Sequence, residues 1–193
     1  MRQTKAQLRA EILTARRAIP ADVRLAEAGA LGVRLARLAD GGETVCAYVP
    51  VGSEPGSVAM LDALVDAGAT VLLPVAREDA AGTPLPLSWG EYRAGKLVAA
   101  GHGLREPAGP TLPPEAIARA ALIVVPALAV DRAGVRLGRG AGFYDRSLTL
   151  ADPAARLVAI VRDDELRDRL PGAAHDVAMT HALTPGHGLV ELG

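Results

Sequence analysis

Residues 131–146 are the part of the sequence best suited to chemistry, because they combine glycines at alternate positions with arginines. The glycines are Gly138, Gly140 and Gly142, and the arginines are Arg136, Arg139 and Arg146. Glycine lets the backbone approach a ligand closely and aim several N–H groups at an anion, and guanidinium groups bind phosphate oxygens. The segment therefore predicts a phosphate-binding loop, with a plain structural turn as the alternative.

Phosphate loops of known type do not match this segment. A Walker loop ends in Gly-Lys-Ser or Gly-Lys-Thr, and the dinucleotide fingerprint has a glycine where Phe143 stands. Generic motifs therefore leave the identity of the ligand open.

A second pair of candidates, Lys5 and Arg9, lies four residues apart near the N-terminus. A helix places such a pair on one face, where two cations suit a triphosphate; a solvated helix face is the alternative.

Cys46 lies in an apolar run with no basic neighbour, so it is predicted to be a core residue and not a nucleophile. The four histidines show no spacing suited to zinc.

Helices and strands alternate along the sequence. Thr4 and Gln7 have the form of a capping box and predict a helix that ends before Pro20, and a second apolar helical pattern spans residues 23–38. The later predicted elements are a strand at 44–49, a helix at 57–67, strands at 70–73 and 85–89, a loop at 101–114, a short helix at 116–120, a strand at 122–125, a helix at 143–150 and a strand at 157–161. This order predicts an α/β fold with an open, mostly parallel sheet flanked by helices, whose ligands bind at the carboxyl ends of the strands.

The composition limits the classes of function. The 193 residues, half of them hydrophobic, can form one core, so a single domain spanning residues 1–193 is expected. A formal net charge of −1 provides no global field for nucleic acid or an anionic membrane. No apolar run reaches the ~18 residues of a membrane span, and the lone Cys46 cannot form an internal disulfide, so a cytoplasmic protein is expected.

Residues 136–145 read Arg-Leu-Gly-Arg-Gly-Ala-Gly-Phe-Tyr-Asp, which resembles the signature loop of the 5-formyltetrahydrofolate cyclo-ligases. Further segments fall in the order of that family, namely residues 5–9, residues 48–54, the Gly-Leu-Arg-Glu-Pro run at 103–107 and the His-Asp-Val run at 175–177. The family's loop usually ends in Tyr-Tyr-Asp and often has Gly or Lys at position 141. Phe143 and Ala141 depart from that pattern, and neither departure removes a charge.

The resemblance implies the sugar-phosphate isomerase/CoA transferase-like fold and an ATP-dependent cyclisation of 5-formyltetrahydrofolate to 5,10-methenyltetrahydrofolate, with magnesium as cofactor. We expect a monomer, with a dimer as the alternative. By the resemblance, the residues that bind ATP are Lys5, Arg9, Arg136, Leu137, Gly138, Arg139, Gly140, Ala141, Gly142, Phe143 and Tyr144. Those that bind the folate are Val49, Glu54, Arg139, Gly140, Ala141, Gly142 and Phe143. Arg139 and Tyr144 are the implied catalytic residues, and Asp145 and Asp176 the implied magnesium ligands.

Two alternative functions stay open at this stage. The related fold of sugar-phosphate isomerases and CoA transferases would make Glu54 a base or a nucleophile in a reaction without ATP. A binding module that kept the pocket and lost the chemistry would bind folate or nucleotide without turnover. Trp89 could stack on a pterin ring, but a place in the core is the favoured interpretation.

Overall fold

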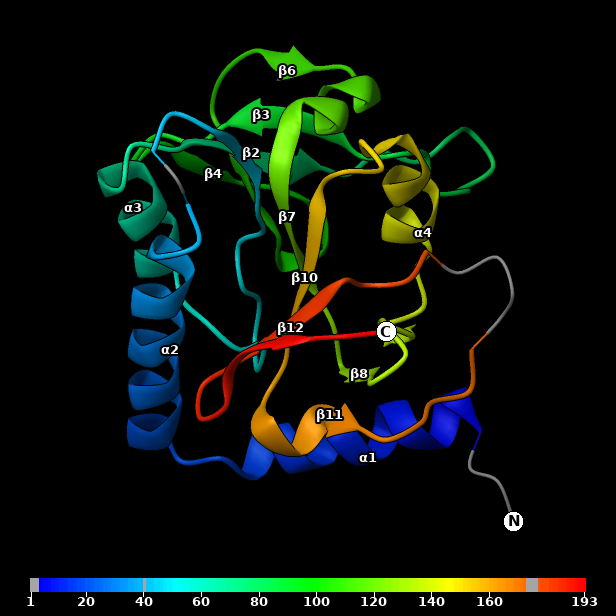
Figure 1. Cartoon of the computed structure of the whole chain (residues 1–193). Helices are drawn as coiled ribbons and strands as arrows, with labels where there is room; N and C mark the ends of the chain where they lie inside the picture. Colours follow the sequence, from blue (N-terminus) through cyan, green and yellow to red (C-terminus); the bar gives the residue numbers. More distant parts are fainter. Residues whose placement is uncertain (1–3, 40, 173–176) are drawn as a thin grey trace.

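The computed structural model of the chain describes residues 4–39, 41–172 and 177–193. The first helix, α1 (Lys5–Ala18), begins at the predicted capping box: the Gln7 backbone N–H donates to the Thr4 hydroxyl at 3.2 Å, and the Thr4 N–H donates to Gln7 Oε1 at 2.8 Å. It lies across one end of the molecule, and α2 (Ala21–Ala36) turns away from it along one side (Figure 1).

An eight-stranded sheet forms the centre of the molecule, with strand order β13-β12-β10-β7-β1-β2-β3-β6. Its strands are β1 (Thr44–Cys46), β2 (Thr70–Val75), β3 (Ser88–Glu91), β6 (Thr111–Leu112), β7 (Ala120–Pro126), β10 (Arg156–Ile160), β12 (His181–Thr184) and β13 (Gly188–Glu191). The five inner strands, from β12 to β2, pair in parallel, whereas the pairings β2–β3, β3–β6 and β12–β13 toward the edges are antiparallel. The expected open, mostly parallel sheet flanked by helices is therefore confirmed.

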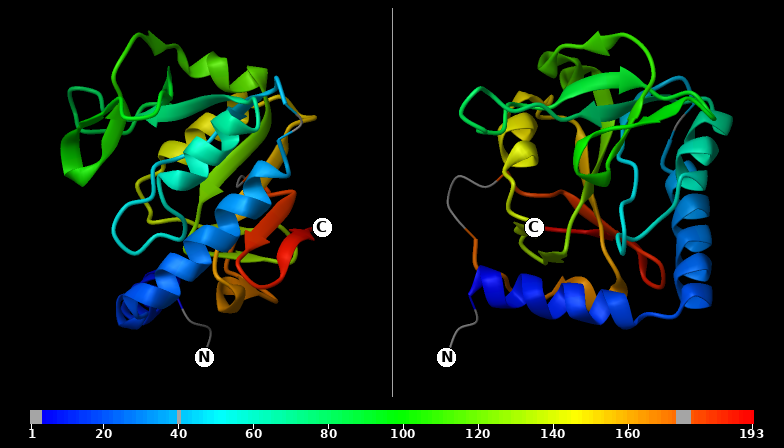
Figure 2. Two further views of the ribbon diagram at one scale, coloured as in Figure 1. Left: turned by 90° about the vertical axis from the view of Figure 1, so that its left-hand side faces the viewer. Right: turned by 180° about the vertical axis from the view of Figure 1, so that it is seen from behind.

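Both faces of the sheet are covered, which explains the continuous apolar run in β7. Leu122 and Val124 face the layer formed by α2 and α3 (Ala59–Asp66), whereas Ile123 and Val125 face the opposite side. That second layer contains η2 (Pro114–Arg119), α4 (Phe143–Ser147) and η3 (Leu148–Leu150), as the views in Figure 2 show. Trp89 is fully buried within it, in agreement with the core interpretation.

A third, smaller cluster joins α1 to the end of the sheet. Leu8 and Ile12, one turn apart on α1, pack with Leu128 and Leu137. The elements beneath the helix are the short strands β8 (Ala129–Asp131), β9 (Arg136–Leu137) and β11 (Leu166–Arg167), which form a three-stranded sheet. This packing brings the first helix against the segment that follows β7.

Several predicted boundaries and one predicted segment differ from the structure. The loop expected at 101–114 contains η1 (Gly101–Gly103), β5 (Arg105–Pro107) and β6, because strands of two or three residues carry too little periodicity to stand out among glycines and prolines. β5 pairs with β4 (Leu97–Ala99). The helix expected at 143–150 is α-helical only to Ser147 and continues as a 3₁₀ turn.

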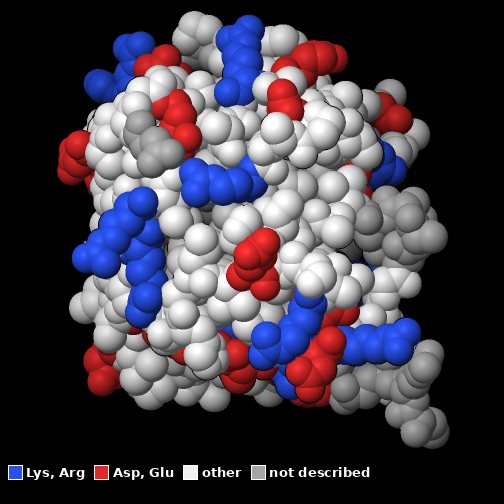
Figure 3. Space-filling view, in the orientation of Figure 1, with Lys and Arg blue, Asp and Glu red and all other residues white. Residues whose placement is uncertain are grey.

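Charged side chains of both signs are interspersed on the face shown in Figure 3, without a continuous basic stripe. None of the helices in the described part of the chain combines the length and the hydrophobicity needed to cross a bilayer.

Candidate active site

A cavity of about 460 Å³ opens at the carboxyl ends of the inner strands. Val49 follows β1, Pro74 lies near the end of β2, and Pro126 ends β7, and all three line the cavity. This edge of a parallel sheet is where α/β proteins characteristically bind ligands. The cavity therefore lies at the edge of the sheet where the predicted α/β fold is expected to bind its ligand.

The glycine-rich loop forms one wall of the cavity between β9 and α4. Gly140 and Gly142 adopt left-handed φ values of 102° and 84°, which side chains with a Cβ rarely take. The Arg9 guanidinium lies 3.4 Å from the position that a Cβ on Gly140 would occupy, so glycine also allows this close approach. The loop thus exposes backbone next to cationic groups, as an anion-binding loop requires.

Arg9 connects α1 to this loop across 129 residues of sequence, because its Nε donates to the Gly138 carbonyl at 2.9 Å. Lys5 is half-buried one turn earlier on the same helix. The two predicted cations therefore lie on the helix that packs against the glycine-rich loop, although neither is among the residues that line the cavity.

Arg136 and Asp145 form an ion pair at the two ends of the loop. The Arg136 side chain is almost fully buried, and its guanidinium lies 5.8 Å from the centroid of the Tyr144 ring, in cation–π range. The Asp145 carboxylate is half exposed and lines the cavity. The loop therefore carries a buried positive charge and, beside it, a carboxylate that a ligand can reach.

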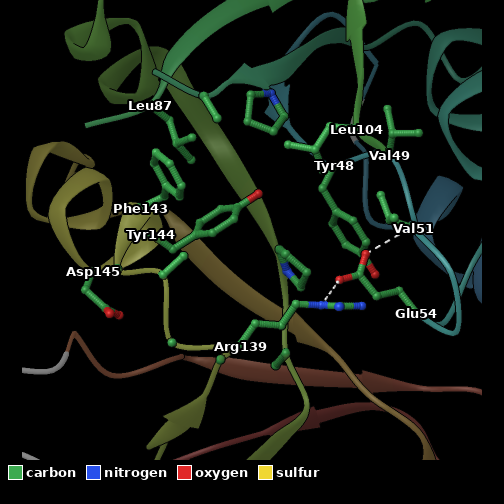
Figure 4. Close-up of a pocket in the computed structure, with 18 of the residues that line it drawn as sticks. Tyr48, Val49, Val51, Glu54, Leu87, Leu104, Arg139, Phe143, Tyr144 and Asp145 are labelled. Atoms are coloured by element: carbon green, nitrogen blue, oxygen red, sulfur yellow. Dashed lines mark hydrogen bonds and ion pairs between the residues drawn. The ribbon is translucent and has the colours of Figure 1, made fainter. Parts of the chain in front are cut away.

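Arg139 and Glu54 join the glycine-rich loop to the loop that follows β1. Arg139 Nε lies 3.0 Å from Glu54 Oε1, and Glu54 Oε2 accepts a hydrogen bond of 2.9 Å from the Val51 N–H (Figure 4). Only 11% of the Glu54 side chain is exposed, against 49% for Arg139. A buried carboxylate and a half-exposed cation thus meet within one cavity.

Two tyrosines bring hydroxyl groups to this region. The Tyr48 hydroxyl donates to the Pro55 carbonyl at 3.0 Å. The Tyr144 hydroxyl is buried at the cavity wall and has no hydrogen-bond partner among the described residues. Burial, reinforced by the nearby Glu54 carboxylate, raises the pKa of Tyr144, so the hydroxyl stays protonated and can donate to a bound ligand.

All three tyrosines of the chain should resist ionisation. Burial raises the pKa of Tyr48 well above its usual value, and burial together with the Asp62 hydrogen bond of 2.6 Å raises the pKa of Tyr92 to about 12. Because these folded-state pKa values are raised, the stability they contribute is complete below the unfolded pKa of about 10 and is lost as the pH rises through the folded values. We expect almost no tyrosinate absorbance from the native protein at pH 10 and about half ionisation in urea at the same pH. A native protein with one tyrosine ionised at pH 10 would contradict this.

The structure gathers most of the predicted site residues around one cavity. Its lining includes Val49, Glu54, Arg136, Gly138, Arg139, Gly140, Ala141, Gly142, Phe143, Tyr144 and Asp145. Leu137 instead points into the core beneath α1, because it belongs to the short strand β9. Asp176 lies outside the described residues.

The cavity-lining residues that the sequence prediction missed have apolar side chains or polar side chains that are buried in the fold. They include Tyr48, Val51, Leu87, Leu104 and Glu106. Glu106 is buried, accepts from the Ala76 N–H at 3.1 Å and pairs with Arg77 at 2.9 Å. The family resemblance includes residues 103–107 without assigning them a role. An apolar side chain near a strand end has no sequence signal that distinguishes a pocket wall from the core.

A magnesium ion bound with a triphosphate needs only one or two protein carboxylates, since phosphate oxygens and water complete the shell. The Asp145 carboxylate fits this requirement, because it is half exposed in the cavity beside the glycine-rich loop. Within residues 4–39, 41–172 and 177–193, no three His, Cys, Asp or Glu side chains gather as metal ligands. The described residues therefore suit a metal that arrives with a phosphate ligand, and not a preformed metal cage.

The fold and the cavity define an α/β enzyme in which a glycine-rich loop and the buried Glu54 carboxylate line the same cavity. The model of the 5-formyltetrahydrofolate cyclo-ligase family matches residues 1–185, and the chain belongs to this family. It is 62% identical over 190 residues, covering 98% of both chains, to the 5-formyltetrahydrofolate cyclo-ligase of Mycolicibacterium smegmatis. It is 29% identical over 143 residues to the protein of that name from Escherichia coli, covering 74% of this chain and 78% of that one.

Solved structures agree on the fold. The 5,10-methenyltetrahydrofolate synthetase of Aquifex aeolicus superposes with a TM-score of 0.74 at 23% identity, covering 98% of this chain and 93% of that one. The protein of the same name from Mycoplasma pneumoniae gives a TM-score of 0.70 at 18% identity, with coverages of 92% and 96%. At these identities the superpositions establish the fold alone.

Proposed function

We propose that this protein closes 5-formyltetrahydrofolate to 5,10-methenyltetrahydrofolate with consumption of ATP. The observation that carries the proposal is the Arg139–Glu54 contact, which joins an anion-binding loop and a buried carboxylate within one cavity. A phosphate donor on the loop and a folate on the carboxylate would then face each other. Membership of the cyclo-ligase family supports this choice of substrates.

The reaction balances without a covalent enzyme intermediate. The formyl oxygen attacks the γ-phosphorus of ATP, ADP leaves, and a phosphorylated imidate forms on N5. N10 then attacks the imidate carbon and loses its proton, and phosphate leaves with the former formyl oxygen. Positioning two bound substrates and neutralising charge supplies most of the acceleration that such phosphoryl transfer needs.

The cations around the glycine-rich loop would hold the phosphates. Arg136 and Arg139 line the cavity, Arg9 on α1 contacts the loop at Gly138, and Lys5 lies one turn before Arg9 on the same helix. Burial raises the pKa of Cys46 to about 12, so the only thiol is held in its unreactive form. This distribution of groups suits phosphoryl transfer between substrates better than nucleophilic catalysis.

Glu54, Val49 and Tyr144 would orient the folate. A carboxylate accepts hydrogen bonds from the amide and amino edge of a pterin, and the apolar cavity walls suit its ring. The protonated Tyr144 hydroxyl would donate to a ligand oxygen.

Magnesium bound through Asp145 would neutralise phosphate charge. A reducing compartment such as the cytoplasm suits a chain with one buried thiol.

Replacing Glu54 with glutamine should weaken folate binding more than nucleotide binding. The substitution removes a charge-assisted hydrogen bond worth about 1.5–3 kcal/mol, so we expect the KM for 5-formyltetrahydrofolate to rise about 10- to 100-fold. Steady-state kinetics with each substrate varied in turn measure the effect. Glu78→Gln, which removes a carboxylate from the exposed rim of the same cavity, should change the KM less than about threefold. Equal effects of the two substitutions would contradict the role of Glu54.

The route of the formyl oxygen tests the proposed chemistry. When 5-formyltetrahydrofolate carries heavy oxygen in its formyl group, the released phosphate should contain one heavy oxygen per turnover. Mass spectrometry of the phosphate reads this out. Unlabelled phosphate accompanied by methenyl product would exclude attack of the formyl oxygen on ATP, whereas ligand binding without product would indicate a binding module.

A further inference from the structure

A buried ion network lies behind the active-site cavity. Arg16 on α1 is 1% exposed and pairs with both carboxylate oxygens of Glu165, from Nε to Oε1 at 2.6 Å and from Nη2 to Oε2 at 2.7 Å. Its Nη2 also donates to the carbonyl of Ala127, which lines the cavity. Glu165 itself lies in η4 (Asp163–Glu165), directly after the central strand β10. The network therefore joins α1, the sheet and the cavity floor.

Arg162 extends this network toward the loop that carries Glu54. Its backbone N–H donates to Glu165 Oε2 at 2.7 Å, and its Nε pairs with Glu27 on α2 at 2.8 Å. Its Nη1 donates to the Ser53 carbonyl at 3.2 Å, across 109 residues of sequence. Only 5% of the Arg162 side chain is exposed. The Arg162 guanidinium thus contacts Glu27 and the Ser53 carbonyl, and its Nη1 lies 3.9 Å from Glu165 Oε1.

The loop that carries Glu54 has little regular structure of its own. It lies between β1 and α3, and the glycines that flank Glu54 on either side, Gly52 and Gly56, adopt φ values of 62° and 98°. Glycine allows such sharp reversals, and it also leaves the backbone free to adopt others. Within the loop, the Val51 N–H holds one carboxylate oxygen of Glu54 at 2.9 Å, and contacts from outside the loop fix the backbone on either side of it.

Two buried side chains provide those contacts. The Ser53 carbonyl, directly before Glu54, accepts from Arg162, and the Pro55 carbonyl, directly after it, accepts from the Tyr48 hydroxyl at 3.0 Å. The backbone on both sides of Glu54 is thus hydrogen-bonded to buried side chains, while the carboxylate contacts Arg139 and lines the cavity. A binding group gains its geometric precision from such supporting contacts.

We propose that Arg162 is a positioning residue that fixes the Glu54 carboxylate for folate recognition. The proposal rests on the proposed function, because it takes Glu54 as the group that contacts the folate. Arg162 does not line the cavity, so it acts through the Ser53 carbonyl and not on the substrate itself. The planar guanidinium is essential, since it binds Glu27 and Ser53 in different directions, and a lysine ammonium cannot satisfy both positions at once.

The experiment compares Arg162→Lys with Glu27→Gln. Both substitutions disturb the same ion pair, and Arg162→Lys keeps the positive charge beside Glu165, but only Arg162→Lys removes the contact with Ser53. We expect Arg162→Lys to raise the KM for 5-formyltetrahydrofolate about tenfold, equivalent to about 1.4 kcal/mol, while the KM for ATP changes less than about twofold. We expect Glu27→Gln to change neither KM more than about twofold. Thermal unfolding of both variants shows whether they are equally folded.

The possible results separate the inference from the proposed function. An unchanged folate KM in folded Arg162→Lys, equal increases for folate and ATP, or an equal effect of Glu27→Gln would each overturn the positioning role and leave the cyclisation intact. If Arg162→Lys does not fold, isothermal titration of 5-formyltetrahydrofolate into the double variant Arg162→Gln/Glu27→Gln, which removes both partners of the ion pair together with the Ser53 contact, should show affinity lowered several-fold, and unchanged affinity would overturn the inference. Absence of ATP-dependent product from the wild-type protein would refute the proposed function itself.

Discussion

Arg139→Ala is expected to lower kcat about 10²- to 10³-fold, the usual cost of removing one group that stabilises charge in a transition state. Arg139, in the glycine-rich loop, lines the cavity and contacts Glu54. Its side chain is 49% exposed, so the free energy of unfolding should change by less than about 1 kcal/mol. Steady-state kinetics and urea unfolding of the same preparation measure both quantities.

Arg146→Ala is the matched control for this substitution. Arg146 follows the same loop, and its Nη1 donates to the Gly142 carbonyl at 3.1 Å, but it does not line the cavity. It should retain kcat within about threefold. Wild-type turnover in a folded Arg139→Ala protein, or an equal loss in Arg146→Ala, would show that Arg139 does not stabilise the transferred phosphoryl group.

Glu165→Gln is expected to have the largest effect on stability, a loss of about 3–5 kcal/mol in the free energy of unfolding. Glu165 is 3% exposed and is the carboxylate shared by Arg16 and Arg162. Removing its charge leaves two buried guanidinium groups without a full countercharge. The free-energy cost of such an uncompensated buried charge is far larger than the stability that an intact buried ion pair contributes. Urea denaturation, with the midpoint and the slope analysed together, provides the measurement.

The exposed pair between Glu91 and Arg93 provides the control. Its atoms lie 3.4 Å apart and its side chains are 54% and 73% exposed, so Glu91→Gln should change the free energy of unfolding by less than about 0.5 kcal/mol. If Glu165→Gln proved as mild as Glu91→Gln, the buried network would contribute nothing to stability.

The parts of the fold that the sequence predicts depend on local patterns. The capping box at Thr4 and the continuous apolar run of β7 each reflect a few neighbouring residues, and both are confirmed. The strand β12 and the edge strand β13 were not predicted, because each is four residues long and forms by pairing with a neighbour, β12 with β10 and β13 with β12. Elements of that length depend on tertiary contacts more than on propensity.

In the site, too, residues that are neighbours in the sequence could be predicted, whereas contacts between distant residues could not. The glycine-rich loop is contiguous, so its residues could be predicted together, and nearly all of them line the cavity. The partners of those residues lie far away in the sequence: Glu54 is 85 residues from Arg139, and Glu165 is 149 residues from Arg16. Arg16 looks like any basic residue near the end of an exposed helix, and only the folded chain shows it buried against a carboxylate.

The most direct test mixes the purified protein with 5-formyltetrahydrofolate, magnesium and ATP and follows the near-ultraviolet absorbance of the methenyl product, with ATP omitted in a parallel sample. We expect the absorbance to rise only when ATP is present, with one ADP released for each methenyl group formed. No rise with ATP, while calorimetry shows that both ligands bind, would contradict the cyclo-ligase activity and leave a binding protein in its place.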